Sequence, residues 1–203
     1  MKKPINEINN LIEIMSSSNT LKLNIRRNLS LPHVTDDSLV IFKKGVFGVY
    51  RLSNHQLIFN IKSPWVLGFS LIEGDDYQLY ARARTDCEYE VIKKEVAFEL
   101  IERNNAWKDT CAVLMFLSSV CFQRSISTTG LLAFDIVRIT LNELLEYDSA
   151  LVENTNIADY VIEKTLLSRS AVMGILKDMK KSGLIVVNRG RLISISKSFS
   201  LTI

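Results

Sequence analysis

The chain has 203 residues, of which 47% are hydrophobic and 23% are charged, and its formal net charge is +3 at pH 7. This balance is typical of a globular protein with one or two domains and argues against a disordered or fibrous chain. The N-terminus lacks an apolar segment with a cleavage site, and the longest nearly uncharged run, 110–123, is too short to cross a bilayer. We therefore expect a cytoplasmic protein with no membrane partner. The three cysteines, Cys87, Cys111 and Cys121, lack the spacing of a disulfide framework or a zinc site, so we expect neither a metal nor a cofactor.

The first 94 residues combine one helical pattern with a series of short strand patterns. A helical period predicts an amphipathic helix at the start, formed by Ile5, Ile8, Leu11, Ile12 and Met15. From residue 21 onwards the period shortens to two, and turn residues such as Gly45 and Gly74-Asp75-Asp76 separate the runs. The predicted strands are 21–25, 39–42, 46–52, 57–61, 78–84 and 88–92. Short strands at this spacing indicate a small antiparallel barrel or sandwich over residues 1–94.

A connecting helix is predicted within residues 95–129, with its densest apolar run from Trp107 to Phe122. Along this run, side chains recur at spacings of four and three residues, as in a coiled-coil seam, and the other sides are apolar too. Such a helix needs a cover on both faces, and we expect its own β-domain on one side and the same helix of a second subunit on the other. The predicted homodimer interface consists of Trp107, Cys111, Leu114, Leu117, Ser118 and Cys121. The alternative is a helix wholly inside one domain, because periodicity does not identify the partner.

A second domain is predicted for residues 130–203, after a small polar interval at 125–130 that we interpret as a hinge. Asn156 can cap a short helix in this domain, and Ser168 can cap a longer one that Gly183 ends. The other predicted boundaries are 131–147 for the first helix, 169–182 for the third helix, and 184–187 and 192–195 for two strands of a hairpin. This order of elements predicts a winged helix-turn-helix.

The third helix of this domain is the predicted recognition helix. Its core face consists of Val172, Ile175, Leu176 and Met179, which recur at helical spacing. The residues that we predict to contact DNA are Ser168, Arg169, Ser170, Met173, Gly174, Lys177 and Lys181 on this helix, with Arg189 and Arg191 in the hairpin. Residues 155–203 hold eight basic and three acidic side chains, a net charge of +5, which would attract a polyanion. The alternative is a solvated basic face on a helical hairpin.

This order of parts resembles the cyclic-AMP receptor protein and fumarate/nitrate regulator (CRP/FNR) family over nearly the full chain. The local matches are Leu132-Ala133-Phe134-Asp135, the run Ala81-Arg82-Ala83-Arg84-Thr85 with Cys87-Glu88, and Ser168-Arg169 with Val172 and Ile175-Leu176-Lys177. The resemblance implies an α+β fold with an N-terminal antiparallel β-roll, a long dimerisation helix and a C-terminal winged helix-turn-helix. It also implies a homodimeric transcriptional regulator that binds double-stranded DNA, with RNA polymerase as a further partner.

Within the family the chain is most similar to the enterobacterial IprA branch, which implies a role in oxidative-stress control. The matches to this branch are Thr165, Ser168-Arg169-Ser170 and the run from Asn188 to Ile195, NRGRLISI. Arg169 falls where the cyclic-AMP receptor protein uses an arginine in the major groove. That protein's glutamate and second base-reading arginine are replaced here by Ser170 and Gly174, so the resemblance implies a different operator.

The same resemblance implies a degenerate nucleotide pocket. The family's ribose-binding glutamate follows a glycine that matches Gly68, and this chain has Phe69 in its place. The phosphate-binding arginine and serine of the family align with Tyr77 and Gln78. A buried cyclic phosphate without those groups would be destabilised by an amount on the order of several kcal/mol. We therefore expect that cyclic AMP is not a ligand.

Three alternatives to a DNA-binding regulator remain open. Ile162 and Leu166 stand where the motif prefers a small residue and a glycine, and with Gly174 they favour a protein-interaction module that has lost DNA binding. A thiol or haem sensor would use Cys111 and Cys121 or the histidines, although we interpret these cysteines as buried and inert, and His33 and His55 as surface or structural residues. An enzyme is disfavoured, because no nucleophile elbow, P-loop, HExxH or dinucleotide motif predicts a catalytic residue.

Overall fold

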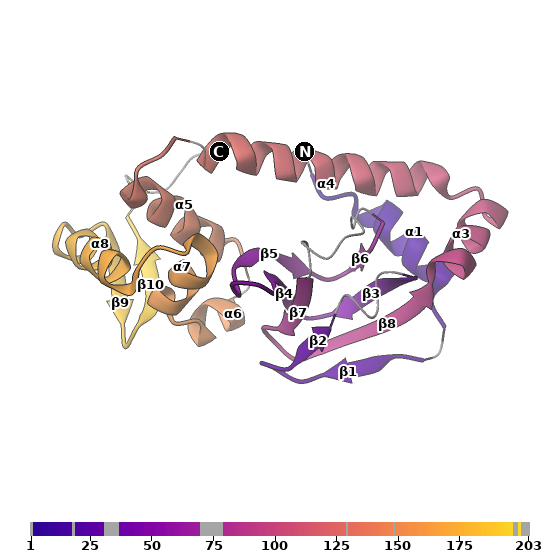
Figure 1. The fold of residues 1–203 in the computed structure, drawn as a ribbon, viewed down its shortest axis with the longest axis horizontal. Coiled ribbons are helices and arrows are strands. Elements are labelled where there is room, and N and C mark those ends of the chain that lie inside the picture. Colours follow the sequence, from indigo (N-terminus) through magenta and orange to yellow (C-terminus); the bar gives the residue numbers. More distant parts are fainter. Residues whose placement is uncertain are drawn as a thin grey trace. The chain divides into compact units, whose positions relative to one another are not determined.

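The chain folds into two compact units, Met1–Ile126 and Ser127–Ile203, which are described in turn (Figure 1). The computed structural model describes residues 2–17, 19–30, 37–69, 79–128, 130–147, 149–196 and 199. Several sequence predictions fall outside these residues, namely those for His33, Tyr77, Gln78, Lys197 and the turn at 74–76. Among the described residues, no helix has the length and hydropathy required to span a membrane.

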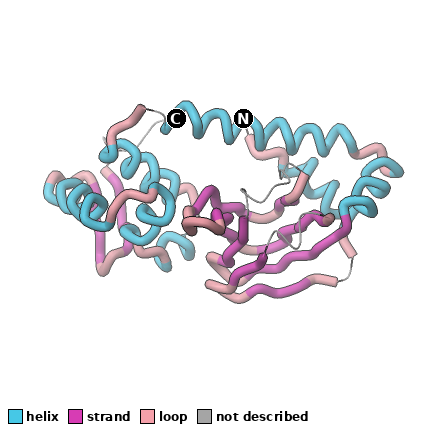
Figure 2. The backbone as a smooth tube through the Cα atoms, in the orientation of Figure 1, coloured by secondary structure: helices cyan, strands magenta, loops and turns pink. Residues whose placement is uncertain are grey.

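The N-terminal unit is a roll of two four-stranded antiparallel sheets (Figure 2). In strand order, one sheet consists of β1 (Leu21–Leu23), β8 (Cys87–Lys93), β3 (Ser38–Lys44) and β6 (Trp65–Leu67). The other consists of β2 (Asn28–Ser30), β7 (Leu79–Ala83), β4 (Val46–Arg51) and β5 (Leu57–Lys62). The sequence did not predict β2 and β6, since three residues are too few to establish a period of two. The remaining strands confirm the predicted antiparallel roll.

The core of the roll draws on both sheets and on three helices. Phe42 of β3 and Phe47 of β4 are fully buried, and their ring centroids lie 4.0 Å apart. The helices are α1 (Ile5–Met15), α3 (Lys94–Arg103) and α4 (Trp107–Thr128), each with apolar side chains in the same cluster. As predicted, α1 is amphipathic and buries Ile8, Leu11 and Met15. The roll therefore has one continuous core, which α4 helps to close through Val113.

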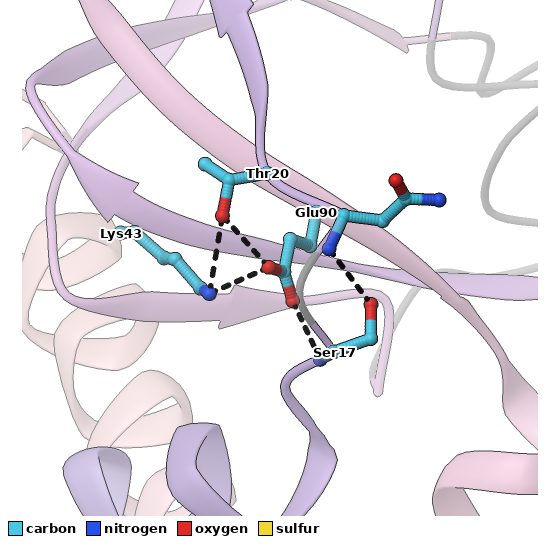
Figure 3. Close-up of polar contacts among 5 residues, drawn as sticks. Ser17, Thr20, Lys43 and Glu90 are labelled. Atoms are coloured by element: carbon cyan, nitrogen blue, oxygen red, sulfur yellow. Dashed lines mark hydrogen bonds and ion pairs between the residues drawn. The ribbon is translucent and has the colours of Figure 1, made fainter.

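A buried carboxylate fixes the connection between α1 and β1 on the roll (Figure 3). Glu90 of β8 accepts hydrogen bonds from the backbone N–H of Ser17 at 3.0 Å, the Thr20 hydroxyl at 2.8 Å and the Lys43 ammonium at 2.6 Å. Burial alone would raise the pKa of Glu90, but these hydrogen bonds and the charge of Lys43 outweigh it and lower the pKa below its usual value. The carboxylate therefore stays ionised at neutral pH and holds three separate segments together.

The predicted connecting helix is in fact two helices. α3 ends at Arg103, Asn105 adopts a left-handed conformation with φ 53°, and α4 begins at Trp107. Asparagine tolerates this conformation better than most residues, which is a stop signal that apolar periodicity does not detect. α4 also continues to Thr128, beyond the predicted end of its apolar run. The helix thus extends into the interval that we interpreted as a hinge.

One side of α4 lies on the roll and the opposite side is exposed. Thr110 and Val113 are buried, and Leu117 packs partly buried against the core of its own unit. Met115 and Phe122 are 66% and 67% exposed, so the outward face is apolar. Cys111 and Cys121 are also exposed, so our interpretation of these cysteines as buried was wrong. Cys87 is buried, and desolvation raises its pKa to about 11.

The C-terminal unit is a helical bundle that ends in a β-hairpin. Its helices are α5 (Ala133–Leu145), α6 (Ser149–Asn154), α7 (Ile157–Thr165) and α8 (Arg169–Lys181), and its strands are β9 (Ile185–Asn188) and β10 (Arg191–Ile195). Three of the four residues predicted for the core face of α8, Val172, Leu176 and Met179, are buried together with Val137 and Leu141 of α5. The fourth, Ile175, is only partly buried. The short helix α6 was not predicted, because six residues hold less than two turns of a helical pattern.

Candidate nucleic-acid interface

The first turn of α7 organises the candidate interface. The side chain of Asn156 accepts hydrogen bonds from the backbone N–H groups of Ala158 and Asp159, at 3.0 and 3.3 Å, and so acts as the predicted N-cap. The backbone N–H of Ile157, which has no partner within the helix, donates to the carbonyl of Gly190 in the hairpin at 2.9 Å. Capping of α7 therefore also fixes the turn of the hairpin.

The turn between α7 and α8 is closed by hydroxyl groups. Thr165 donates to the carbonyl of Val161 at 2.7 Å and accepts from the backbone N–H of Leu167 at 3.2 Å. Leu166, where the motif prefers glycine, adopts φ 59°, so a branched side chain occupies a left-handed position at a cost of about 1–2 kcal/mol. Ser168 is the N-cap of α8 and accepts from the backbone N–H of Ala171 at 3.3 Å. The turn geometry of the motif is thus kept without its glycine.

The outward face of α8 is the surface that we predicted to contact DNA. All seven of its predicted residues are exposed: Ser168, Arg169, Ser170, Met173, Gly174, Lys177 and Lys181. A Cβ atom built on Gly174 has no neighbour within 4 Å, so the glycine leaves an open shallow position in the middle of the face. With cations, hydroxyls and a helix N-terminus together, this face can attract and hydrogen-bond a polyanion.

Arg169 already has a partner within the unit. Its Nη1 lies 3.1 Å from Oδ1 of Asp159 in the first turn of α7, and the side chains are 71% and 56% exposed. An exposed ion pair of this kind contributes at most about 1 kcal/mol to stability. The sequence did not predict this contact, although both residues stand near helix starts that the turn brings together.

One lysine of the basic segment is buried and paired with a carboxylate. Lys164 was counted as part of the basic segment, but its side chain is only 7% exposed and its Nζ lies 2.9 Å from Oε2 of Glu143 on α5. The ion pair ties α7 to α5, so Lys164 is not available to a polyanion. The exposed cations among the described residues of this segment are Arg169, Lys177, Lys180, Lys181, Arg189 and Arg191.

The hairpin presents its two arginines from a fixed turn. Arg189 and Gly190 have φ values of 48° and 79°, which is the pattern of a type I′ turn. Gly190 is required for a second reason, because a Cβ atom there would lie 2.8 Å from Nδ2 of Asn156. Arg189 and Arg191 are exposed on either side of this glycine. The first turn of α7 therefore contacts both the start of α8 and the turn that carries these arginines.

The residues predicted to form a degenerate nucleotide pocket are only partly described. Gly68 has φ 120°, and a Cβ atom there would lie 2.9 Å from Cδ2 of Leu39, so the backbone approaches the sheet closely. Phe69 stacks on Phe98 of α3 with ring centroids 6.5 Å apart, and Phe98 in turn contacts Trp107 at 5.8 Å. Phe69, which we predicted to replace the family's glutamate, is thus an aromatic ring that contacts a helix of its own unit.

The comparisons with known proteins agree with this geometry. Residues 133–199 match the family model described as winged helix-turn-helix DNA binding. The chain is 24% identical over 200 residues to a Salmonella typhimurium protein named inhibitor of hydrogen peroxide resistance, and the match covers 97% of this chain and 96% of that protein.

Solved structures of bacterial regulators, including members of the CRP/FNR family, share the fold over most of the chain. The c-di-GMP-responsive global regulator CLP of Xanthomonas campestris aligns with a TM-score of 0.73 at 15% identity, covering 95% of this chain and 99% of that one. The CRP/FNR-family regulator TTHA1359 of Thermus thermophilus aligns with a TM-score of 0.67 at 15% identity, covering 89% and 96%. These findings confirm the predicted resemblance and fold, including the winged helix-turn-helix.

Proposed function

We propose that this protein is a homodimeric transcriptional regulator that binds operator DNA in the cytoplasm through α8 and the hairpin. The observation that carries the proposal is the exposed face of α8, which combines cations, hydroxyl groups and an open glycine beside a hairpin with two exposed arginines. The similarity to inhibitors of hydrogen peroxide resistance supports a role in controlling the response to peroxide. RNA polymerase is a further partner that the family resemblance implies.

The proposed homodimer would form through α4. Trp107, Met115, Phe122 and Ile126 are 41–67% exposed on that helix. An apolar face of this kind is stabilised when a second apolar surface covers it, and the same helix of a second copy would do so with two-fold symmetry. Met115 and Phe122 were not in the predicted interface, but their exposure makes them stronger candidates than Leu117, which packs on its own core.

The roll is proposed not to respond to cyclic AMP. Phe69 stacks on Phe98 at the position of the family's ribose-binding glutamate, and an aromatic ring cannot accept the hydrogen bonds that a ribose would offer. Titration calorimetry with millimolar cyclic AMP is expected to give no saturable heat. A saturable heat that Gln78→Ala abolishes would contradict this proposal and would restore a nucleotide-controlled mechanism.

Exposed cysteines favour thiol sensing as a second candidate function. Cys111 and Cys121 are both free and are exposed in the single protomer, on the helix α4 that is proposed to form the dimer interface. Their oxidation could therefore alter the packing of that interface. Peroxide would oxidise a thiolate to a sulfenic acid and be reduced to water. The test is operator binding before and after peroxide treatment, with the Cys111→Ser/Cys121→Ser variant as control. Peroxide-sensitive binding that the variant lacks would support this function.

The main proposal is tested by genome-wide footprinting of the tagged protein, followed by binding titrations on the recovered sites. We expect inverted-repeat sites whose half-site centres lie about one helical turn of DNA apart, as a two-fold dimer requires. Affinity for these sites should fall steeply with salt concentration. An absence of enriched sites, together with no salt-dependent DNA binding in vitro, would favour the protein-interaction module instead.

A further inference from the structure

The ion pair between α7 and α8 bears on how the proposed interface would distinguish DNA sequences. Arg169 is the first residue of α8, at the positive end of the helix dipole, and the first turn of α8 contains no acidic residue. The compensating negative charge comes from Asp159, in the first turn of α7, at 3.1 Å from Nη1 of Arg169. Asp159 therefore favours the position in which the guanidinium lies against the first turn of α7.

The ion pair leaves most of the guanidinium available. Within the described part of the chain, Arg169 donates one side-chain hydrogen bond, from Nη1 to Oδ1 of Asp159. A guanidinium carries five N–H donors, and two of them suffice for the O6 and N7 acceptors of a guanine edge. Arg169 can thus keep its contact with Asp159 while it donates to a base, and the carboxylate then acts as a support rather than a competitor.

We propose that Asp159 is a positioning residue for Arg169 and that it increases the sequence specificity of DNA binding. This inference rests on the proposed function. A held arginine loses less rotamer freedom when it docks on a base, which favours sequences that offer the matching acceptors. On other sequences Arg169 gains no matching base contact, while the negative charge of Asp159 still repels the phosphate backbone and weakens binding. Both effects act in the same direction.

The experiment measures dissociation constants for two duplexes, an operator selected by the wild-type protein from random DNA and a scrambled version of it. We expect Asp159→Asn to tighten binding to the scrambled duplex by about three- to tenfold and to change operator binding less than twofold, so the specificity ratio falls. Asp159→Glu, which keeps the charge, should largely restore the ratio. The matched control is Asp178→Asn, which removes one exposed carboxylate from α8 and should change both duplexes alike.

A double-mutant cycle separates positioning from a simple charge effect. In an Arg169→Ala background, Asp159→Asn should change both duplexes by the same factor, because there is no guanidinium left to hold. Equal tightening on both duplexes in the wild-type background, as in the Asp178→Asn control, would overturn the positioning role. A fall in the ratio that persists without Arg169 would overturn it as well. If the wild-type protein selects no sequence from random DNA, the proposed function itself is wrong, and that result appears before any variant is made.

Discussion

Helices α4 and α8 each bury one face against their own unit, but their exposed faces differ in chemistry. The outward face of α4 carries Trp107, Met115 and Phe122, whereas that of α8 carries Arg169 and Lys177. An exposed apolar face is stabilised when another protein surface covers it, and an exposed cationic face stays hydrated until a polyanion replaces the water. The same helical burial pattern can therefore prepare a surface for a second protein chain or for DNA, depending on the outward positions alone.

The largest expected effect is on α4. Phe122→Arg should break the proposed homodimer, because it removes an aromatic ring that is 67% exposed in the protomer and places a charge in the interface. The loss of burial is about 1.5–3 kcal/mol per side chain, and two-fold symmetry doubles it to about 3–6 kcal/mol, a weakening of 100-fold or more. Sedimentation velocity at micromolar concentration measures the change from dimer to monomer.

The control for this substitution is Gln123→Arg, which adds the same charge at the next exposed position of α4. Gln123 lies about 100° around the helix from Phe122, away from the middle of the apolar face. The control protein should remain dimeric. A soluble wild-type monomer, or a Phe122→Arg protein that sediments as a dimer, would show that the apolar face of α4 does not form a dimer interface.

The buried face could be predicted from apolar periodicity for α8 but not for α4. For α8, the spacing of Val172, Leu176 and Met179 was sufficient to identify the buried face, since the opposite side has no continuous apolar stripe. For α4, nearly every side is apolar, so periodicity could not show which residues its own roll would cover. The assignment of Leu117, Met115 and Phe122 needed the three-dimensional arrangement of the roll.

Contacts between elements were the other part that the sequence could not predict. The pairs Lys164 with Glu143 and Arg169 with Asp159 join residues on different helices, and local patterns carry no information on which side chains meet across a turn. Local signals succeeded where the physics is local, as in the caps at Asn156 and Ser168. The sequence also predicted the hairpin around Gly190, although not its type I′ turn or its docking on α7.

The next largest effect is expected at two arginines of the proposed DNA-binding surface. Arg169→Ala should remove a base contact worth about 1–3 kcal/mol per half-site and relax the preference at one base position. Arg191→Ala should weaken binding to all sequences alike and lower the salt slope by about one counterion per half-site. Titrations on operator and scrambled duplexes at several salt concentrations measure both quantities. If the two variants lose operator and scrambled binding in the same proportion, α8 and the hairpin do not differ in role.

A smaller effect distinguishes two lysines of the same basic segment. Lys164→Met should lower the free energy of unfolding by about 1–2 kcal/mol, because it leaves the Glu143 carboxylate without this buried partner. The loss is less than for a fully buried pair, since Glu143 keeps 31% exposure and methionine retains the packing of the lysine stem. Lys177→Met, on the exposed face, should leave stability unchanged and lower the salt slope by about one. Urea unfolding measures the stability of both variants, and salt titration of DNA binding measures their salt slopes. If Lys164→Met lowered the salt slope and Lys177→Met lowered the stability instead, the cationic surface would lie elsewhere.

The smallest change in stability is expected at Gly174, where stability and binding should change in opposite directions. Glycine inside a helix costs about 1 kcal/mol relative to alanine, and leucine has nearly the propensity of alanine. Because a Cβ atom at Gly174 would have no neighbour within 4 Å, Gly174→Leu should stabilise the fold by about 0.5–1 kcal/mol. The same side chain would stand between α8 and the bases, so operator affinity should fall at least tenfold, by about 1.4 kcal/mol or more.

Gly174→Ala is the matched control, because it brings a similar gain in helix propensity with a single methyl group and should keep most of the operator affinity. Thermal unfolding and operator titration measure the two changes. If Gly174→Leu and Arg169→Ala both bound the operator as the wild-type protein does, the polar face of α8 would not be the DNA-reading surface. It would then be a solvated helix face without a role in DNA binding.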